Sequence, residues 1–123
     1  MKRSLGYLLV SFSFLYSVKE CSAQADPAAY LNNIKAELQK KWPNNSTINL
    51  VFHGHSVPTG YANTPYVHRL QAYSFLVLKM LNEKYPYSVV NVITTSIGGE
   101  NSVQGEKRIR KDVLAMRPDV LFI

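Results

Sequence analysis

Three short apolar runs mark the candidate strands of the chain. Residues 47–52, Thr-Ile-Asn-Leu-Val-Phe, are mostly apolar and β-branched and lie between turn-forming residues. This pattern is typical of a fully buried parallel strand. Residues 89–93 and 120–123 are apolar runs of similar length and are predicted to form two further strands.

Amphipathic segments precede each of these runs. Residues 26–41 begin with Asp26 and Pro27, a helix N-cap followed by proline at the first helical position. Residues 66–83 are predicted to form a second helix, and Asn101 or Ser102 caps a third. Apolar residues at helical spacing are the candidate core positions of these two helices: Val67, Leu70, Tyr73, Leu76, Val77, Met80 and Leu81, then Val103, Ile109, Val113, Leu114 and Met116.

The alternation of helix and strand, repeated three times, predicts an α/β fold with a parallel sheet covered by helices on both faces. The third apolar run reaches Ile123, the last residue. Since a parallel strand normally leads into a loop and another helix, we expect the chain to be the N-terminal part of a longer domain.

The first 23 residues have the pattern of a secretory signal peptide. Lys2 and Arg3 form a basic start, residues 6–18 are apolar, and small residues around Ala23 provide a cleavage site. A membrane anchor or a buried helix is the alternative, but the apolar run is shorter than the roughly 20 residues that span a bilayer. We therefore expect residues 1–23 to be removed and residues 24–123 to belong to one secreted or periplasmic domain, without stable membrane insertion.

Removal of this segment changes the charge and the cysteine count. The net charge falls from +6 to +4, because Lys2, Arg3, Lys19 and Glu20 are lost. The only cysteine, Cys21, is lost as well, so no internal disulfide is expected. Much of the remaining positive charge lies on one predicted helix, which we interpret as a solvated face and not as a nucleic-acid site: Lys107, Arg108, Arg110 and Lys111.

Candidate chemistry lies directly after the first predicted strand, in the sequence His53-Gly54-His55-Ser56. In open α/β sheets, ligands bind outside the carboxyl ends of the strands. Ser56 therefore occupies a position suited to a nucleophile, and Gly54 gives the turn its backbone freedom. The structural alternative is that Ser56 is a polar cap on the following turn.

Two segments resemble motifs of one hydrolase family. Gly54-His55-Ser56 after the first strand, and residues 96–101 after the second, are similar to the first two sequence blocks of the SGNH (GDSL-type) hydrolases. The resemblance spans about residues 47–123 and implies a three-layer α/β/α, flavodoxin-like parallel sheet. It implies that Ser56 is the nucleophile and that the N–H groups of Ser56 and Gly99 are oxyanion-hole donors. Gly105 and Arg108 resemble a glycine and a basic residue of the family's next helix.

The chain departs from the family pattern at two points. His55 replaces the usual aspartate beside the nucleophile, where it is either a hydrogen-bond partner of the site or simply a loop histidine. The family's third and fifth blocks do not occur before Ile123. The third oxyanion donor and the catalytic His and Asp are therefore expected beyond Ile123, and the 123-residue chain alone is expected to be inactive.

The resemblance implies a secreted serine esterase that removes an acyl or acetyl group from a carbohydrate or lipid, with no cofactor or metal. Its expected partner is a small-molecule or polysaccharide ester, and Tyr61 and Tyr66 could stack on a sugar ring. One alternative is a non-catalytic, carbohydrate-binding relative with the same fold. Another is a metal-dependent hydrolase that uses His53 and His55, because residues i and i+2 of a strand share a face. The sequence does not determine the oligomeric state.

Overall fold

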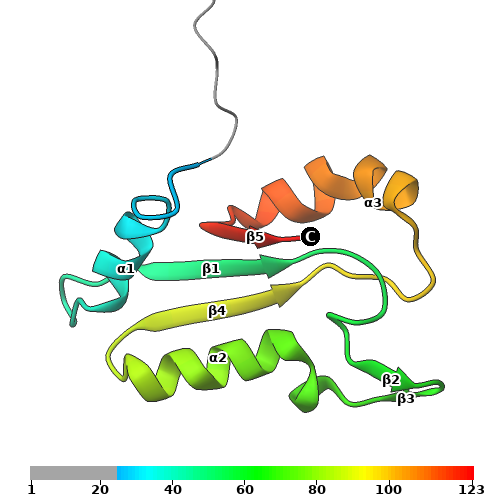
Figure 1. Cartoon of the computed structure of the whole chain (residues 1–123), viewed down its shortest axis with the longest axis horizontal. Coiled ribbons are helices and arrows are strands. Elements are labelled where there is room, and N and C mark those ends of the chain that lie inside the picture. Colours follow the sequence, from blue (N-terminus) through cyan, green and yellow to red (C-terminus); the bar gives the residue numbers. More distant parts are fainter. Residues whose placement is uncertain (1–24) are drawn as a thin grey trace, which may run out of the picture.

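The computed structural model describes residues 25–123, so the predicted signal peptide at 1–23 lies outside the described residues. A parallel sheet of three strands crosses the molecule in the order β4-β1-β5 (Figure 1). Its strands are β1 (Thr47–Phe52), β4 (Val89–Thr94) and β5 (Val120–Phe122). The predicted parallel α/β sheet is confirmed.

β1 is the central strand and carries most of the core. It pairs with β4 along its whole length, from Thr47 opposite Val89 to Phe52 opposite Thr94. On its other side, β5 pairs with the second half of β1. The spatial order of second, first and third strand is that of flavodoxin-like sheets, in which ligands bind where the strand order reverses. In this chain the order reverses between β1 and β5, so the switch point lies at the carboxyl ends of these two strands.

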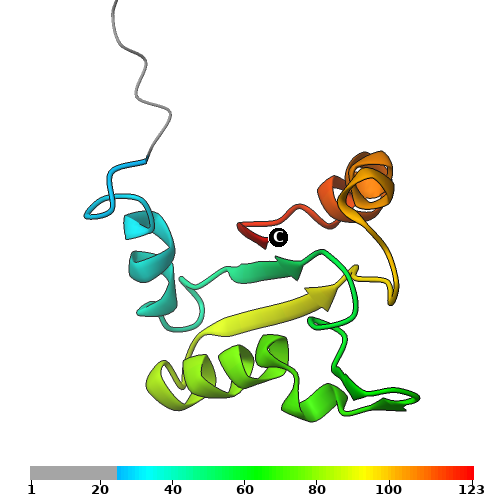
Figure 2. The ribbon, with the colours of Figure 1, turned by 45° about the vertical axis from the view of Figure 1, so that its right-hand side comes forward.

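Helices cover both faces of the sheet, as predicted (Figure 2). Ile48, Leu50 and Phe52 point to one face, where they pack with residues of α1 (Asn32–Leu38) and α2 (Tyr73–Lys84). Successive side chains of a strand point to opposite faces. Accordingly, the Asn49 amide of β1 donates to the main-chain oxygen of Met116, on the side of the sheet that α3 (Ser102–Arg108) covers.

The first predicted helix is shorter than expected. Asp26 caps an isolated turn, in which its carboxylate accepts from the N–H of Ala28 at 2.9 Å and its carbonyl oxygen accepts from Tyr30 at 2.8 Å. The helix α1 begins only at Asn32 and ends at Leu38. The cap motif at Asp26 was therefore identified correctly, but it closes a turn that does not continue into the helix.

The second predicted helix was wrong at its start. Residues 66 and 67 form β3 (Tyr66–Val67), which pairs with β2 (Tyr61–Asn63) in a small antiparallel hairpin. A 3₁₀ turn at Arg69–Gln71 follows, and α2 begins at Tyr73. Two predicted core residues are consequently exposed, since Val67 lies in the hairpin and the Leu70 side chain is 78 % exposed. Within α2, three further predicted core positions were wrong, because the side of the helix that carries them is exposed: Tyr73, Leu76 and Met80. Within residues 25–123, no helix is long and apolar enough to cross a membrane.

The third predicted helix begins as expected and then changes geometry. Asn101 is its N-cap and forms a reciprocal capping box with Gln104. The regular helix α3 ends at Arg108, and a π-helical segment and a 3₁₀ turn follow as Ile109–Val113 and Leu114–Met116. Of the predicted core positions, Val113 is fully buried, whereas three are exposed and were wrong: Val103, Leu114 and Met116.

Candidate functional site

The loops after β1 and β4 lie side by side at the carboxyl edge of the sheet. The N–H of Ile97 donates to the Gly54 carbonyl oxygen at 3.1 Å, which joins the two loops close to β1. The hydroxyl groups of Thr59 and Ser96 lie 2.6 Å apart and join them again farther along. The loops that carry Ser56 and Gly99 are thus fixed to each other by main-chain and side-chain contacts.

Ser56 is half-buried at the start of a tight turn. Its carbonyl oxygen accepts from the N–H groups of Thr59 and Gly60, both at 3.2 Å, so the main chain closes the turn. The side chain does not cap this turn, in contrast to the structural alternative considered above. Within residues 25–123, the hydrogen-bond partner of the Ser56 hydroxyl is Nδ1 of His55, at 3.3 Å. This distance is at the long limit for such a bond, so the hydroxyl is held only weakly.

Gly99 lies exposed in the loop after β4 with φ of +80°, a conformation that favours glycine. A Cβ atom built there would meet no heavy atom within 4 Å, so the space next to the Gly99 backbone is open. Its neighbour Gly98 packs against the ring of Tyr61. The Tyr61 side chain therefore lies beside the loop that carries Gly99, whereas Tyr66 is exposed in the hairpin.

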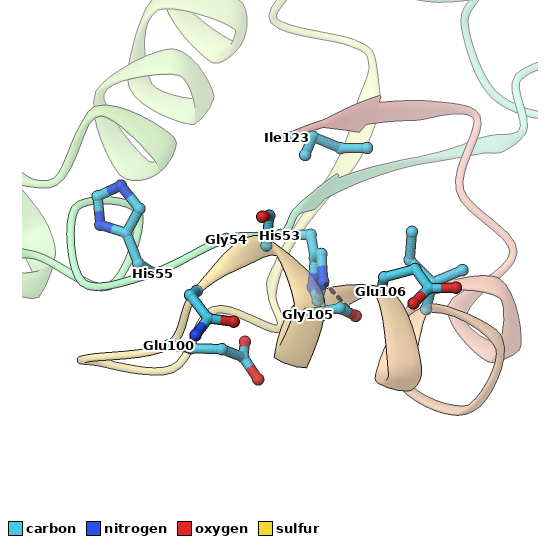
Figure 3. Close-up of a pocket in the computed structure, with 10 residues that line it drawn as sticks. His53, Gly54, His55, Glu100, Gly105, Glu106 and Ile123 are labelled. Carbon is cyan, nitrogen blue, oxygen red and sulfur yellow. Dashed lines mark hydrogen bonds between the residues drawn. The ribbon is translucent and has the colours of Figure 1, made fainter.

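His53 is buried, and both of its ring nitrogens are occupied. Nε2–H donates to the carbonyl oxygen of Gly105 at 3.1 Å, because that oxygen can only accept (Figure 3). Nδ1 therefore accepts from the Thr95 hydroxyl at 2.9 Å. His53 thus has no free nitrogen for a metal or for the Ser56 proton, and His55 points away from it (Figure 3). This geometry does not support a metal site at His53 and His55, and residues 25–123 contain no cluster of three or more His, Cys, Asp or Glu residues that could hold a metal.

Arg108 joins the loop after β4 to α3. Its Nε and Nη2 bind both oxygens of the Glu100 carboxylate, the Nε bond measuring 2.7 Å. Nη1 donates to Asp112 at 2.5 Å, and Nη2 also donates to the Thr95 carbonyl oxygen at 3.0 Å. The predicted solvated helix face is therefore wrong for Arg108, although Lys107, Arg110 and Lys111 are exposed as expected.

These contacts shift the ionisation of the paired groups. The hydrogen bond from Arg108 lowers the pKa of Glu100, and partial burial opposes that effect. The same hydrogen bonds, to Glu100 first and then to Asp112, raise the pKa of Arg108. Both groups are thus charged at neutral pH and form a partly buried ion pair.

A cavity of about 310 Å³ lies between the carboxyl ends of β1 and β5 and the start of α3 (Figure 3). It is lined by residues of these three regions, among them His53, His55, Glu100, Gly105 and Ile123. Ser56 and Gly99 do not line it. Its position is where ligands bind in sheets of this order, yet the sequence offered no sign of it, because its walls come from residues up to 70 positions apart.

Comparison with known proteins identifies the fold. No protein-family model matches the sequence, and no curated protein matches it. Among solved structures, the chain is similar to a two-domain esterase active on acetylated mannans, with a TM-score of 0.62 and 22 % sequence identity. The match covers 75 % of this chain and 24 % of that chain, so this chain spans about a quarter of the solved esterase. The chain therefore has an esterase-like α/β fold.

Proposed function

We propose that the protein is a secreted serine esterase of the SGNH type. Ser56 is its nucleophile, and the N–H groups of Ser56 and Gly99 donate to the oxyanion of the tetrahedral intermediate. The ester is an acyl or acetyl group on a carbohydrate or lipid. The proposal uses no metal and no cofactor, and it assigns no catalytic base among residues 25–123.

One observation carries the proposal: the loop that contains Ser56 and the loop that contains Gly99 are joined at the carboxyl edge of the sheet. The Ile97–Gly54 and Thr59–Ser96 contacts hold the two loops together at the carboxyl ends of β1 and β4. A serine esterase needs its hydroxyl and its oxyanion donors on one side of the same carbonyl group. Ser56 and Gly99 lie on these two loops, and the Ser56 hydroxyl is not used in capping.

The fold comparison supports a choice of the first substrate to test. The solved esterase with a similar fold acts on acetylated mannans, so an acetylated polysaccharide is the first substrate to test here. Tyr61 lies beside Gly98 and next to Gly99, where its ring could pack on the sugar that carries the acetyl group. His55 is proposed as a hydrogen-bond partner of Ser56 and not as its base, because it is exposed and its bond to Ser56 is long.

The test compares Ser56→Ala with the unmodified protein on p-nitrophenyl acetate and on acetylated mannan. Both proteins are made at full length, because residues 1–123 alone are expected to be inactive. Loss of the nucleophile should lower kcat by on the order of 10³-fold or more, since removal of a triad member has effects of this size or larger. Ser88→Ala is the matched control, because Ser88 lies in the turn before β4 and bonds only to the Tyr85 carbonyl oxygen. A serine-directed phosphonate should label Ser56, as shown by mass spectrometry of the digested protein.

Two results would contradict this function. Hydrolysis by Ser56→Ala at the rate of the unmodified protein would exclude Ser56 as the nucleophile. Binding of acetylated mannan without any acetate release would instead favour the carbohydrate-binding relative with the same fold.

A further inference from the structure

Arg108 bridges the two ends of the loop between β4 and α3. At the first end, its Nη2 donates to the Thr95 carbonyl oxygen at 3.0 Å. At the second end, its guanidinium binds the Glu100 carboxylate through two nitrogens. Gly98 and Gly99 lie between these two anchor points. The Arg108 side chain therefore connects the two ends of this short loop directly.

The middle of the loop has little other support. Gly99 is exposed, and no heavy atom lies within 4 Å of the position that a Cβ atom would take there. The main-chain bond from the Glu100 N–H to the Ile97 carbonyl oxygen is long, at 3.3 Å. Both glycine residues also have wide backbone freedom. The direction of the Gly99 N–H consequently depends on the contacts of Ser96 and Ile97 before it and on the Glu100 anchor after it.

The same anchors reach the loop that carries Ser56. The Thr95 hydroxyl donates to Nδ1 of His53, and Nε2 of His53 donates to Gly105 of α3. Gly105 permits this close approach, because a Cβ atom there would lie 3.1 Å from Nε2. His53 is three residues before Ser56, so the network links both loops to α3 through buried hydrogen bonds.

We propose that Arg108 is a positioning residue, which holds the loop from Thr95 to Glu100 so that the Gly99 N–H points at the oxyanion. This inference rests on the proposed esterase function. Arginine suits the task because its planar group donates in several fixed directions, whereas lysine carries one compact charge. The partial burial of the pair keeps solvent from loosening it, with the Glu100 side chain only 8 % exposed.

The experiment uses Arg108→Lys, which removes the planar guanidinium group but keeps the positive charge. We expect kcat on p-nitrophenyl acetate to fall about tenfold to a hundredfold, since a displacement of about 1 Å in a catalytic group has effects of this size. KM should change by less than about twofold, because the lost interaction acts in the transition state. Amide hydrogen exchange of residues 97–100 should become faster. Arg110→Lys is the matched control and should change none of these values, since Arg110 is exposed on the π-helical segment that follows α3.

The outcomes separate this inference from the proposed function. Unchanged kcat together with unchanged exchange in Arg108→Lys would overturn the inference. If Arg108→Lys is unfolded at the assay temperature, Glu100→Gln replaces it. This variant keeps the shape of the Glu100 side chain but removes its charge, and kcat and amide exchange are judged in the same way. If Ser56→Ala remains active, the proposed function fails, but the exchange data still decide whether Arg108 holds the loop.

Discussion

At the scale of single residues, the candidate oxyanion donor depends on a backbone conformation. Gly99 has φ of +80°, and the space around it is open. A side chain at this position would thus meet no neighbour but would strain the main chain. This distinguishes Gly99 from Gly98, whose φ is not positive and whose neighbour is the Tyr61 ring.

We expect Gly99→Ala to turn the strained main chain and so misdirect its N–H, which should lower kcat by up to about 10²–10³-fold, the loss found when one oxyanion donor is removed. Its thermal stability should fall modestly, by about 1–2 kcal/mol for a non-glycine residue in the left-handed region. Steady-state kinetics and thermal denaturation, measured on the same preparation, check both values. Gly98→Ala is the control and should retain most of the activity. A Gly99→Ala variant with unchanged kcat would contradict the role of the Gly99 N–H.

At the scale of elements, the ion pair of Glu100 and Arg108 fastens the start of α3 to the end of the β4 loop. Asn101, the N-cap of α3, follows Glu100 directly, so the cap and the ion pair adjoin. The groups that face Glu100 are Arg108 and His53, which favour its charged form, and Asp112, which opposes it. The lowered pKa of Glu100 therefore links this connection to pH.

This linkage has a definite sign. Because the folded-state pKa of Glu100 is below its ordinary value of 4.5, the pair stabilises the fold above that pH. The contribution is lost as the pH falls through the folded-state pKa. Melting temperatures of the unmodified protein and Glu100→Gln should thus differ at pH 7 and converge as the pH falls below 4.5 and through the lowered pKa of Glu100. Glu106→Gln, on the exposed face of α3, serves as the control. A difference that stays constant with pH would contradict the assignment.

At the scale of the whole molecule, the core is built around the end of β1. Phe52 is fully buried, and its ring stacks on Phe122 of β5, with centroids 4.4 Å apart. It also meets Tyr73 at the start of α2 edge-on, at 5.4 Å. This one side chain therefore joins two strands and a helix, and it directly precedes His53 in the chain.

Phe52→Ala should lower the free energy of unfolding by about 3–5 kcal/mol, the usual cost of removing a buried aromatic ring. Urea denaturation, followed by circular dichroism, measures this change. Leu70→Ala is an informative control, because the hydrophobic pattern places Leu70 in the core but the structure exposes it. Its effect should stay within about 0.5 kcal/mol. Equal losses of unfolding free energy in Phe52→Ala and Leu70→Ala would indicate that Leu70 lies in the core, as the hydrophobic pattern of the sequence predicts.

The sequence by itself determined the three strands of the parallel sheet and the loops that carry the candidate site residues. Residues 47–52 were predicted with their observed bounds, since a buried strand has a continuous apolar pattern that needs no partner to be recognised. The Asn101 cap was also predictable, because capping depends on residues three positions apart. Ser56 and Gly99 could be placed in loops because each follows an apolar run that was recognised as a strand.

Only the tertiary structure decided which side chains these local patterns bury and pair. Val113 and Leu70 are both apolar residues at helical spacing, yet Val113 is buried and Leu70 is exposed, because the chain near Leu70 turns into the hairpin instead. His53 was identified as a possible ligand, but its two nitrogens bind residues 42 and 52 positions away. Arg108 was expected in solvent, but its guanidinium binds Glu100 and Thr95 in the loop before α3. Local spacing does not encode such distant contacts, since they form only when the strands and helices pack together.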